Sequence, residues 1–230
     1  MPSAQTIVVS VGGSLIVPDQ IDVHFLQSLK ACIERHIHNG FRFVIITGGG
    51  KTARRYQEAA KAVVTLSNDD LDWLGIHSTR LNGHLLRTIF SDIAHPVIID
   101  NPDKLEHADA APLYIASGWK PGHSTDFVAV EIAKRLGGKK LVNLSNIDYV
   151  YTDDPKKNAE AKPIQKISWN DFRKLLPDSW DPGLSSPFDP IAAQDAQAAG
   201  MEVAIINGAH LDELDHFIDG TPFVGTRIID

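Results

Sequence analysis

Short apolar runs of strand length alternate with amphipathic stretches along most of the chain. The runs are rich in β-branched residues and lack the polar alternation of a half-exposed sheet, so we expect strands buried on both faces. They lie at residues 6–11, 41–46, 96–100, 111–116, 140–145 and 201–206. Helical spacing of apolar residues separates them, as over residues 22–37 and 127–136. The pattern predicts a three-layer α/β/α sandwich with a mainly parallel central sheet.

Residues 147–188 break this alternation. The segment is rich in Asp, Lys, Pro and Trp, and it predicts at most a short hairpin and one helix near residues 168–176. We interpret it as an insertion or a lid over the sheet. The whole chain has 230 residues, of which 43% are hydrophobic, so it can bury a substantial core in one large α/β domain or in two small ones.

Glycine-rich turns end the first two predicted strands. Residues 12–14 read Gly-Gly-Ser, and residues 48–50 are three glycines. A glycine turn that opens a helix presents free backbone N–H groups, and the helix dipole adds partial positive charge, so phosphate is the natural ligand. Neither turn has the spacing of a P-loop or of a dinucleotide-binding loop. One such turn alone could serve packing only, whereas two at the same edge of the sheet favour an anion site.

Basic residues follow the second turn. Arg54 lies four residues after Gly50, so the first helical turn can direct its guanidinium back toward an anion at the helix N-terminus. Lys51 and Arg55 accompany it. The alternative is a solvated basic helix face. We favour an anion clamp, because the three basic residues cluster beside three glycines.

Two later loops add polar groups at predicted strand ends. Residues 120–126 read Lys-Pro-Gly-His-Ser-Thr-Asp, in which Ser124 or Thr125 can cap the following helix and Asp126 lies in its first turn. An ordinary N-cap explains those three but leaves Pro-Gly-His without a role. Residues 145–157 combine amide, carboxylate, aromatic and ammonium groups that suit a purine, a ribose and phosphates with Mg²⁺, although by composition they are only a polar loop.

Charge and cysteine content narrow the class of protein. The net charge of −7 and the isoelectric point near 5.8 argue against nucleic acid as a partner. Cys32 is the only cysteine, which excludes an intrachain disulfide and indicates core filling, and the ten His residues do not match structural zinc spacings, so we expect no metal site. No apolar run is long enough for a membrane helix and no signal peptide is evident, so we expect a cytoplasmic protein with no membrane partner.

Taken together, the motifs resemble the amino-acid kinase family, and most closely its uridylate kinase branch of the shorter, archaeal type, over nearly the whole chain. The order of the motifs carries the resemblance. They are G-G-S at residues 12–14, G-G-G with an arginine four residues on at 48–54, an acidic residue before T-R-x-N at 72–82, P-G-H-S-T-D at 121–126, the polar loop at 146–156, and a late loop and helix at 185–193.

The resemblance implies roles for individual residues. ATP contacts are implied for Ser10, Val11, Gly12, Gly13, Ser14, Gly50, Arg54, Ser145, Asn146, Tyr151 and Asp154. Contacts to the acceptor are implied for Gly49, Asp72, Trp119, Lys120, Pro121, Gly122, His123, Ser124 and Thr125. Candidates for catalysis are Lys51, which would stabilise the transferred charge, and Asp126 and Asp189, which would organise the metal or cationic groups.

The resemblance further implies transfer of the ATP γ-phosphate to UMP with Mg²⁺, in a homo-oligomer that is commonly a hexamer. A single domain would place the acceptor on residues 1–140 and ATP on residues 141–230. Three residues depart from the pattern: Ser10 replaces a common Lys, and Trp119 and Tyr149 replace small residues. They keep two alternatives open, a non-catalytic nucleotide-binding protein resembling the oxyanion- or molybdenum-storage branch, and a kinase of another small acceptor.

Overall fold

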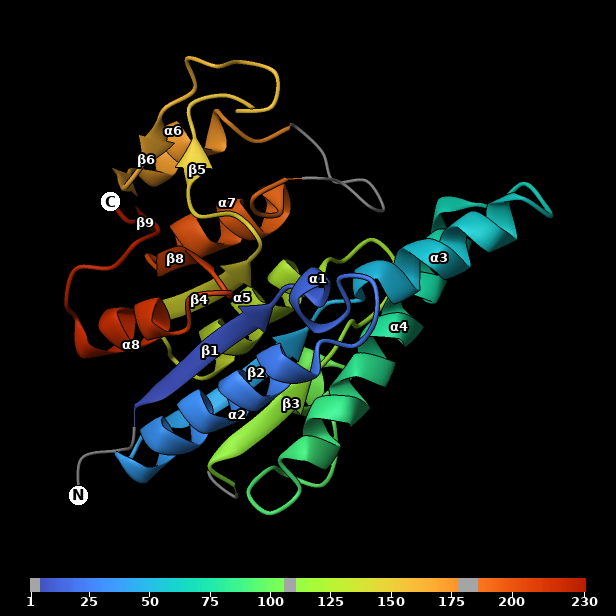
Figure 1. Ribbon diagram of the computed structural model, residues 1–230, viewed down its shortest axis with the longest axis horizontal. Coiled ribbons are helices and arrows are strands. Elements are labelled where there is room, and N and C mark those ends of the chain that lie inside the picture. The colour runs from blue at the N-terminus through green and yellow to red at the C-terminus, as the bar shows by residue number, and fades with distance from the viewer. Residues whose placement is uncertain (1–4, 106–110, 178–185) are drawn as a thin grey trace.

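One twisted sheet runs through the molecule, as the computed structural model shows (Figure 1). The structure describes residues 5–105, 111–177 and 186–230. The main sheet has seven strands in the order β3-β2-β1-β4-β8-β9-β7. Their bounds are β1 Thr6–Val11, β2 Arg42–Thr47, β3 Leu113–Ala116, β4 Lys140–Ser145, β7 Lys166–Ile167, β8 Glu202–Asn207 and β9 Thr226–Ile228. All neighbouring strands are parallel except the pair β8 and β9, which confirms the mainly parallel sheet.

The sequence prediction fails for one strand. Residues 96–100 form no strand, because the segment pairs with β3 only through isolated bridges, Ala94 to Leu113 and Ile99 to Ala116. Its Val97 is 65% exposed, and only Ile99 of the run joins the core beside the sheet. The other five predicted strands are present within two residues of their expected bounds, and β1 and β2 are buried at every position but the first.

Helices cover both faces of the sheet and form the outer layers of the sandwich. One face packs against α2 (Val23–His38), α8 (Asp212–Asp219) and the end of α4 (Asn68–Ile89), where Leu29, Phe217 and Leu86 are fully buried. The other face packs against α5 (Thr125–Arg135), α7 (Pro190–Ala198) and α6 (Trp169–Arg173). The strand residues alternate between these two cores, as Val9 and Val8 do, because successive side chains point to opposite faces.

The expected lid is instead partly built into the sheet and its core. Within residues 147–177, β5 (Val150–Tyr151) and β6 (Pro163–Ile164) form the predicted short hairpin. The segment then supplies the edge strand β7, and α6 buries Trp169, whose indole N–H donates to the Met201 carbonyl at 2.8 Å. Hydrophobic burial holds this part of the segment in place. Residues 178–185 of the predicted lid lie outside the described residues.

A helical arm projects from the sheet beside the first strands. The short helix α1 (Gly13–Ile16) leads from β1, and α3 (Gly50–Lys61) packs along the first half of α4, away from the sheet (Figure 1). Ser67 begins α4 with a reciprocal capping box to Asp70. A single 3₁₀ turn, η1 (Pro102–Lys104), precedes β3. Among the described residues, no helix combines the length and apolar character that a membrane span requires.

Candidate active site

A cleft of about 340 Å³ opens where the carboxyl ends of β1, β2 and β4 meet the starts of α1, α3 and α5. Ligand sites in α/β proteins favour this edge of the sheet. The cleft is lined by Ser10, Gly12, Gly13, Gly48, Gly49, Gly50, Ala53, Arg54, Gln57, Asp72, Gly75, Ile76, Thr79, Gly118, His123, Ser124, Thr125, Asp126, Asn143, Ser145, Ser186 and Pro187.

The two glycine turns pack backbone against backbone in the cleft. A β-carbon placed on Gly13 would lie 2.0 Å from the backbone nitrogen of Gly50, and one on Gly48 would lie 2.4 Å from the nitrogen of Gly13. Gly50 also has a φ of 63°, which side-chain-bearing residues rarely adopt. Asn82 supports the second turn, because its Nδ2 donates to the Gly48 carbonyl at 2.8 Å. The glycines are therefore required for the mutual packing of the turns as well as for access to the backbone.

Helix N-termini converge on the cleft from different parts of the chain. Gly12 and Gly49 are the N-caps of α1 and α3 and provide no capping side chain. The Lys51 N–H in the first turn of α3 donates to the Val17 carbonyl at 3.0 Å, so only part of that turn is open to another acceptor. Ser124 caps α5 by accepting from the Phe127 N–H at 3.1 Å, and Thr125 lines the cleft beside it. This geometry suits more than one phosphate group, because each helix start offers unpaired donors and positive dipole charge.

Asp126 lies on the cleft floor and has no cation among its hydrogen-bond partners in the described residues. Its Oδ1 accepts from Ser10 Oγ at 3.0 Å and from Asn143 Nδ2 at 3.2 Å, and its Oδ2 accepts from the Asp189 N–H at 3.3 Å. Burial, and then the neighbouring Asp189 carboxylate, raise the pKa of Asp126 to about 7, although the hydrogen bonds from Ser10 and Asp189 oppose that rise. A bound cation here would favour the ionised carboxylate.

The basic residues after the second turn separate into two groups. Arg54 lines the cleft. Lys51 and Arg55 point to Asp19 outside it, where Asp19 Oδ1 lies 3.1 Å from Lys51 Nζ and 2.7 Å from Arg55 Nη2. All three of these side chains are at least 43% exposed. Arg54 is thus the Lys or Arg side chain among the described lining residues that could meet an anion in the cleft.

Asp72 and the loop before α5 close the far wall of the cleft. The Gly122 N–H donates to Asp72 Oδ2 at 2.7 Å, which ties α4 to this loop. Burial raises the pKa of Asp72, and the Gly122 N–H opposes the rise. Trp119 lies behind this wall: its ring contacts that of His123, with centroids 5.1 Å apart, and Lys120 Nζ lies 4.0 Å above it. Trp119 therefore shapes the cleft through His123 and not by direct contact.

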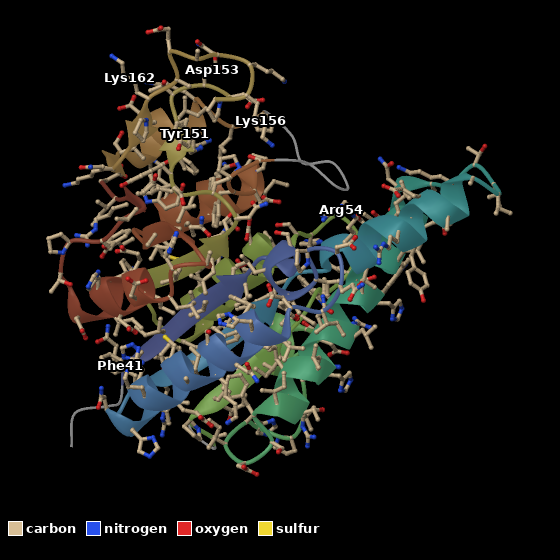
Figure 2. The ribbon with its side chains drawn as sticks, viewed as in Figure 1. Phe41, Arg54, Tyr151, Asp153, Lys156 and Lys162 are labelled. Atoms are coloured by element: carbon tan, nitrogen blue, oxygen red, sulfur yellow. The ribbon has the colours of Figure 1, made fainter. Side chains whose placement is uncertain are left out.

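The polar loop after β4 contributes mainly its first residue to the cleft. Ser145 lines the cleft, whereas Tyr151 lies in β5, and Figure 2 shows Tyr151 and Lys156 in the segment that rises away from Arg54. One acidic group of the loop pairs within the loop, and another pairs with the end of β8. Asp154 Oδ1 accepts from the Lys156 N–H at 3.0 Å, and Asp148 Oδ1 accepts from Asn207 Nδ2 at 2.7 Å.

About half of the site residues predicted from the sequence lie together in the lining of the cleft. Those that line the cleft are Ser10, Gly12, Gly13, Gly49, Gly50, Arg54, Asp72, His123, Ser124, Thr125, Asp126 and Ser145. Those that the structure places outside the lining are Val11, Ser14, Lys51, Trp119, Lys120, Pro121, Gly122, Asn146, Tyr151, Asp154 and Asp189. Asp189 is nevertheless buried directly behind Asp126 and caps α7, where its Oδ1 accepts from the Ala192 N–H at 2.7 Å. Ser14 lines a separate cavity between α1 and α2.

Other lining residues were missed. The apolar pattern places Asn143 in a buried strand, although a single amide in the run of residues 140–145 is a signal that the strand reaches a polar site. Gln57, Gly118 and Thr79 gave no such signal alone. Thr79 Oγ1 accepts from the Gly118 N–H at 2.8 Å, so α4 holds the end of β3 at the cleft.

Known proteins resemble this chain both in fold and in sequence. A model of the amino acid kinase family matches residues 5–207. A uridylate kinase from Pyrococcus abyssi is 36% identical over 202 residues, which are 87% of this chain and 89% of the relative, and one from Methanocorpusculum labreanum is 30% identical over 224 residues, 96% and 94% of the two chains. The crystal structure of a uridylate kinase from Archaeoglobus fulgidus matches with a TM-score of 0.79 at 25% identity, covering 96% of this chain and 99% of that one.

An aspartate kinase from Synechocystis also matches, with a TM-score of 0.74 over 97% of this chain and 39% of its own. At 17% identity this similarity extends to the fold alone. The family match covers most of the chain and includes both glycine turns, the loop before α5 and the strand that carries Asn143. The chain therefore belongs to the amino acid kinase family.

Proposed function

We propose that this chain is an ATP-dependent UMP kinase that transfers the γ-phosphate of ATP to UMP and releases UDP and ADP. The observation that carries the proposal is the convergence of both glycine turns, Arg54 and the N-terminus of α5 on one cleft. The uridylate kinases to which the chain is similar, at 30–36% identity over at least 87% of its length, support the choice of acceptor.

The two phosphates would approach each other across the second glycine turn. In this proposal the ATP phosphates lie on the Gly12–Gly13 turn and the start of α1, with the nucleoside toward Ser145. The UMP phosphate lies toward Ser124 and Thr125 at the start of α5. Such a division uses backbone donors on both sides and leaves the second turn between donor and acceptor.

The reaction requires little acid–base chemistry from the protein. The acceptor oxygen belongs to a phosphate that is already ionised at neutral pH, so no general base has to remove a proton from it. What the site must supply is alignment and neutralisation of charge on the moving group. The position of Arg54 in the cleft wall supports that role. Lys51, the candidate from the sequence, would first have to leave Asp19.

Mg²⁺ fits the donor set of the cleft. Asp126 offers carboxylate oxygens beside the glycine turns, with no cation among its described partners, and hard oxygen ligands are those that Mg²⁺ prefers. When bound with ATP, the ion would neutralise phosphate charge. Ser10 and Asn143 would keep the carboxylate oriented, and Asp189 would act from behind it through its backbone N–H.

We also propose that the chain forms a homo-oligomer, with a hexamer as the expected state, and that it works in the cytoplasm, where ATP and UMP are found. Exposed apolar residues on the α3–α4 arm support self-association: Tyr56 is 63% exposed, Val63 82% and Leu81 63%. Light scattering coupled to size exclusion tests the oligomeric state, since a mass of one chain would contradict it.

The experiment that tests the function measures ADP release with UMP, CMP, GMP, carbamate and amino acids as acceptors. We expect turnover with UMP at a kcat/KM at least about tenfold above that of any other acceptor. Turnover with another acceptor but not with UMP would show that the other acceptor, and not UMP, is the substrate. Tight ATP binding without transfer to any acceptor would instead support a non-catalytic nucleotide-binding protein.

A further inference from the structure

A cluster of metal-ligating side chains joins two helices away from the cleft. Cys32 and His36 lie one helical turn apart on the same face of α2, and Asp215 meets them from α8. One ligand atom from each of the three lies within 4.8 Å of the other two. Phe41, which packs against His36 with ring centroids 5.8 Å apart, marks this end of the molecule in Figure 2, well apart from Arg54.

We propose that Cys32, His36 and Asp215 form a site for a single transition-metal ion of the zinc type, which ties α2 to α8. The atoms are already directed at one point. Asp215 Oδ1 lies 2.7 Å from His36 Nε2 and 3.4 Å from Cys32 Sγ. Ligands bound at about 2.0–2.3 Å in a tetrahedron lie roughly 3.3–3.7 Å apart, so a small widening of the His36–Asp215 contact admits the ion.

The surroundings of Asp215 suit a ligand with one bound oxygen. Its Oδ2 accepts from Arg35 Nη2, which fixes the carboxylate and leaves Oδ1 for the ion. Hydrogen bonds of this kind to the ligands orient metal sites generally. The Asp215 side chain is 26% exposed, so solvent reaches the cluster and can supply the fourth ligand, whereas Cys32 and His36 are only 3% exposed.

His36 places one ring nitrogen in the cluster and the other outside it. Its Nδ1 is buried and has no hydrogen-bond partner among the described residues, although most buried polar atoms in proteins do. The ring's Nε2 faces the cluster and is the atom that would bind the ion. A structural role for the aromatic ring alone would be met by a phenylalanine, since Phe41 and Phe43 already surround it.

Binding of the metal ion releases one proton and leaves the site electrically neutral. The Cys32 S–H bond breaks, its proton passes to solvent, and a sulfur–metal bond forms. The thiolate and the Asp215 carboxylate together neutralise the divalent ion, and the imidazole binds neutral. A Cys, His and carboxylate set with one open position is a donor set that zinc accepts, whereas Mg²⁺ and Ca²⁺ require oxygen ligands.

Cobalt(II) is the probe that tests the site. Untagged, chelator-treated protein under reducing conditions is titrated with Co²⁺, and the thiolate-to-cobalt charge-transfer band in the near ultraviolet is recorded. Because Cys32 is the only cysteine, the band reports this residue alone. We expect one equivalent of Co²⁺ to saturate it, and Zn²⁺ to displace Co²⁺ and raise Tm by about 5–10 °C at 100 times its Kd.

Matched variants separate this site from chance binding by surface histidines. His36→Gln and Asp215→Asn should each weaken Co²⁺ binding about 10- to 100-fold. His38→Gln and Asp219→Asn, exposed positions on the same two helices, should leave it unchanged. Absence of a thiolate band at stoichiometric Co²⁺ in the wild-type protein would overturn the proposal. A band equally strong in His36→Gln and in Asp215→Asn would also overturn it.

Discussion

The glycine-lined floor of the cleft and the polar loop after β4 differ in how their residues are held. On the floor, the turns contact each other through backbone atoms, and Asp126 is fixed by three donors. In the loop, Asp154 pairs with the nearby Lys156 N–H, Asp148 accepts one hydrogen bond from Asn207 at the end of β8, and Asp153 and Thr152 are exposed. Under the proposed function, the phosphates would therefore meet a floor that is already formed, whereas the loop would have to rearrange or accept the nucleoside at its surface. We expect floor substitutions to lower kcat and loop substitutions to raise the KM for ATP.

The largest effect should come from Gly13→Ala. Its β-carbon would meet backbone atoms of Gly48, Gly49 and Gly50 within 2.0–2.7 Å, and backbone has little freedom to move. We expect loss of measurable transfer and a fall of about 2–4 kcal/mol in the free energy of unfolding, measured by urea denaturation. Gly75→Ala is the matched control in the same cleft: its β-carbon meets only Gln57 Nε2 at 3.5 Å, so stability should hold or rise. Equal damage by both would refute the packing argument.

Arg54→Ala should follow, with kcat reduced about 100- to 1,000-fold, because a cation on the transferred phosphate is lost. Arg55→Ala should change kcat less than about twofold, since its exposed partner Asp19 contributes little. Lys51→Ala decides between the structure and the sequence-based role for Lys51. A loss there as large as for Arg54→Ala would show that Lys51 leaves Asp19 and enters the cleft during the reaction.

Because the pKa of Asp126 is raised, we expect the free energy of unfolding to depend on pH in protein free of nucleotide and Mg²⁺. Its pKa rises from 3.8 in the unfolded chain to about 7 in the folded one, so the folded state holds the proton more tightly. Between these values, rising pH therefore lowers the free energy of unfolding, in total by about 4 kcal/mol. The difference in unfolding free energy between wild type and Asp126→Asn should follow this course, falling from pH 4 to 7 and flat above about pH 8. No trend over that range would contradict the burial of this carboxyl.

Asp72→Ala should raise the KM for UMP about tenfold with kcat and the KM for ATP little changed. The reason is that Asp72 accepts the Gly122 N–H at 2.7 Å and so positions the loop that carries Ser124 and Thr125. Asp69→Ala, an exposed acidic residue in the first turn of the same helix, is the control. A rise in the KM for ATP instead would show that ATP, and not UMP, binds on the Asp72 side of the cleft.

The smallest effect should come from the loop. Tyr151→Phe should raise the KM for ATP no more than about threefold, because Tyr151 lies in β5 outside the cleft lining and can contribute one hydrogen bond at most. Steady-state kinetics with ATP as the varied substrate measures it. A tenfold fall in kcat would show that the loop closes onto the transferring phosphate, and the contrast between floor and loop would fail.

The sequence predicted those parts of the molecule that local pattern determines. Apolar runs gave the strands, Ser124 gave the start of α5, and helical spacing placed Arg54 toward Gly50. The apolar run at residues 96–100 wrongly predicted a strand. A strand also needs a partner along its length, and only single bridges to β3 form here. Lys51 could not be assigned from spacing, since its direction depends on Asp19, which lies 32 positions earlier in the chain.

Contacts between segments that are far apart in the chain could not be predicted from the sequence either. Asn143 reads as core until the carboxyl end of β4 is seen to meet Asp126. Cys32 and His36 read as a core cysteine and a scattered histidine until α8 brings Asp215 beside them. The segment predicted as an insertion or a lid also supplies β7 and α6 to the sheet and its core, because burial of Trp169 beside Met201 depends on β8 and its neighbours, which local composition does not reveal.

The central claim is that one cleft holds both phosphate groups, with the second glycine turn between them. Calorimetric titration with a bisubstrate analogue, adenosine and uridine joined through five phosphates, tests it most directly. We predict one molecule bound per chain, at least about 100-fold tighter than ATP or UMP alone, with the apparent Kd of the analogue raised in proportion to the concentration of either competing nucleotide. Binding no tighter than that of ATP, or ATP and the analogue bound together on one chain, would contradict the account.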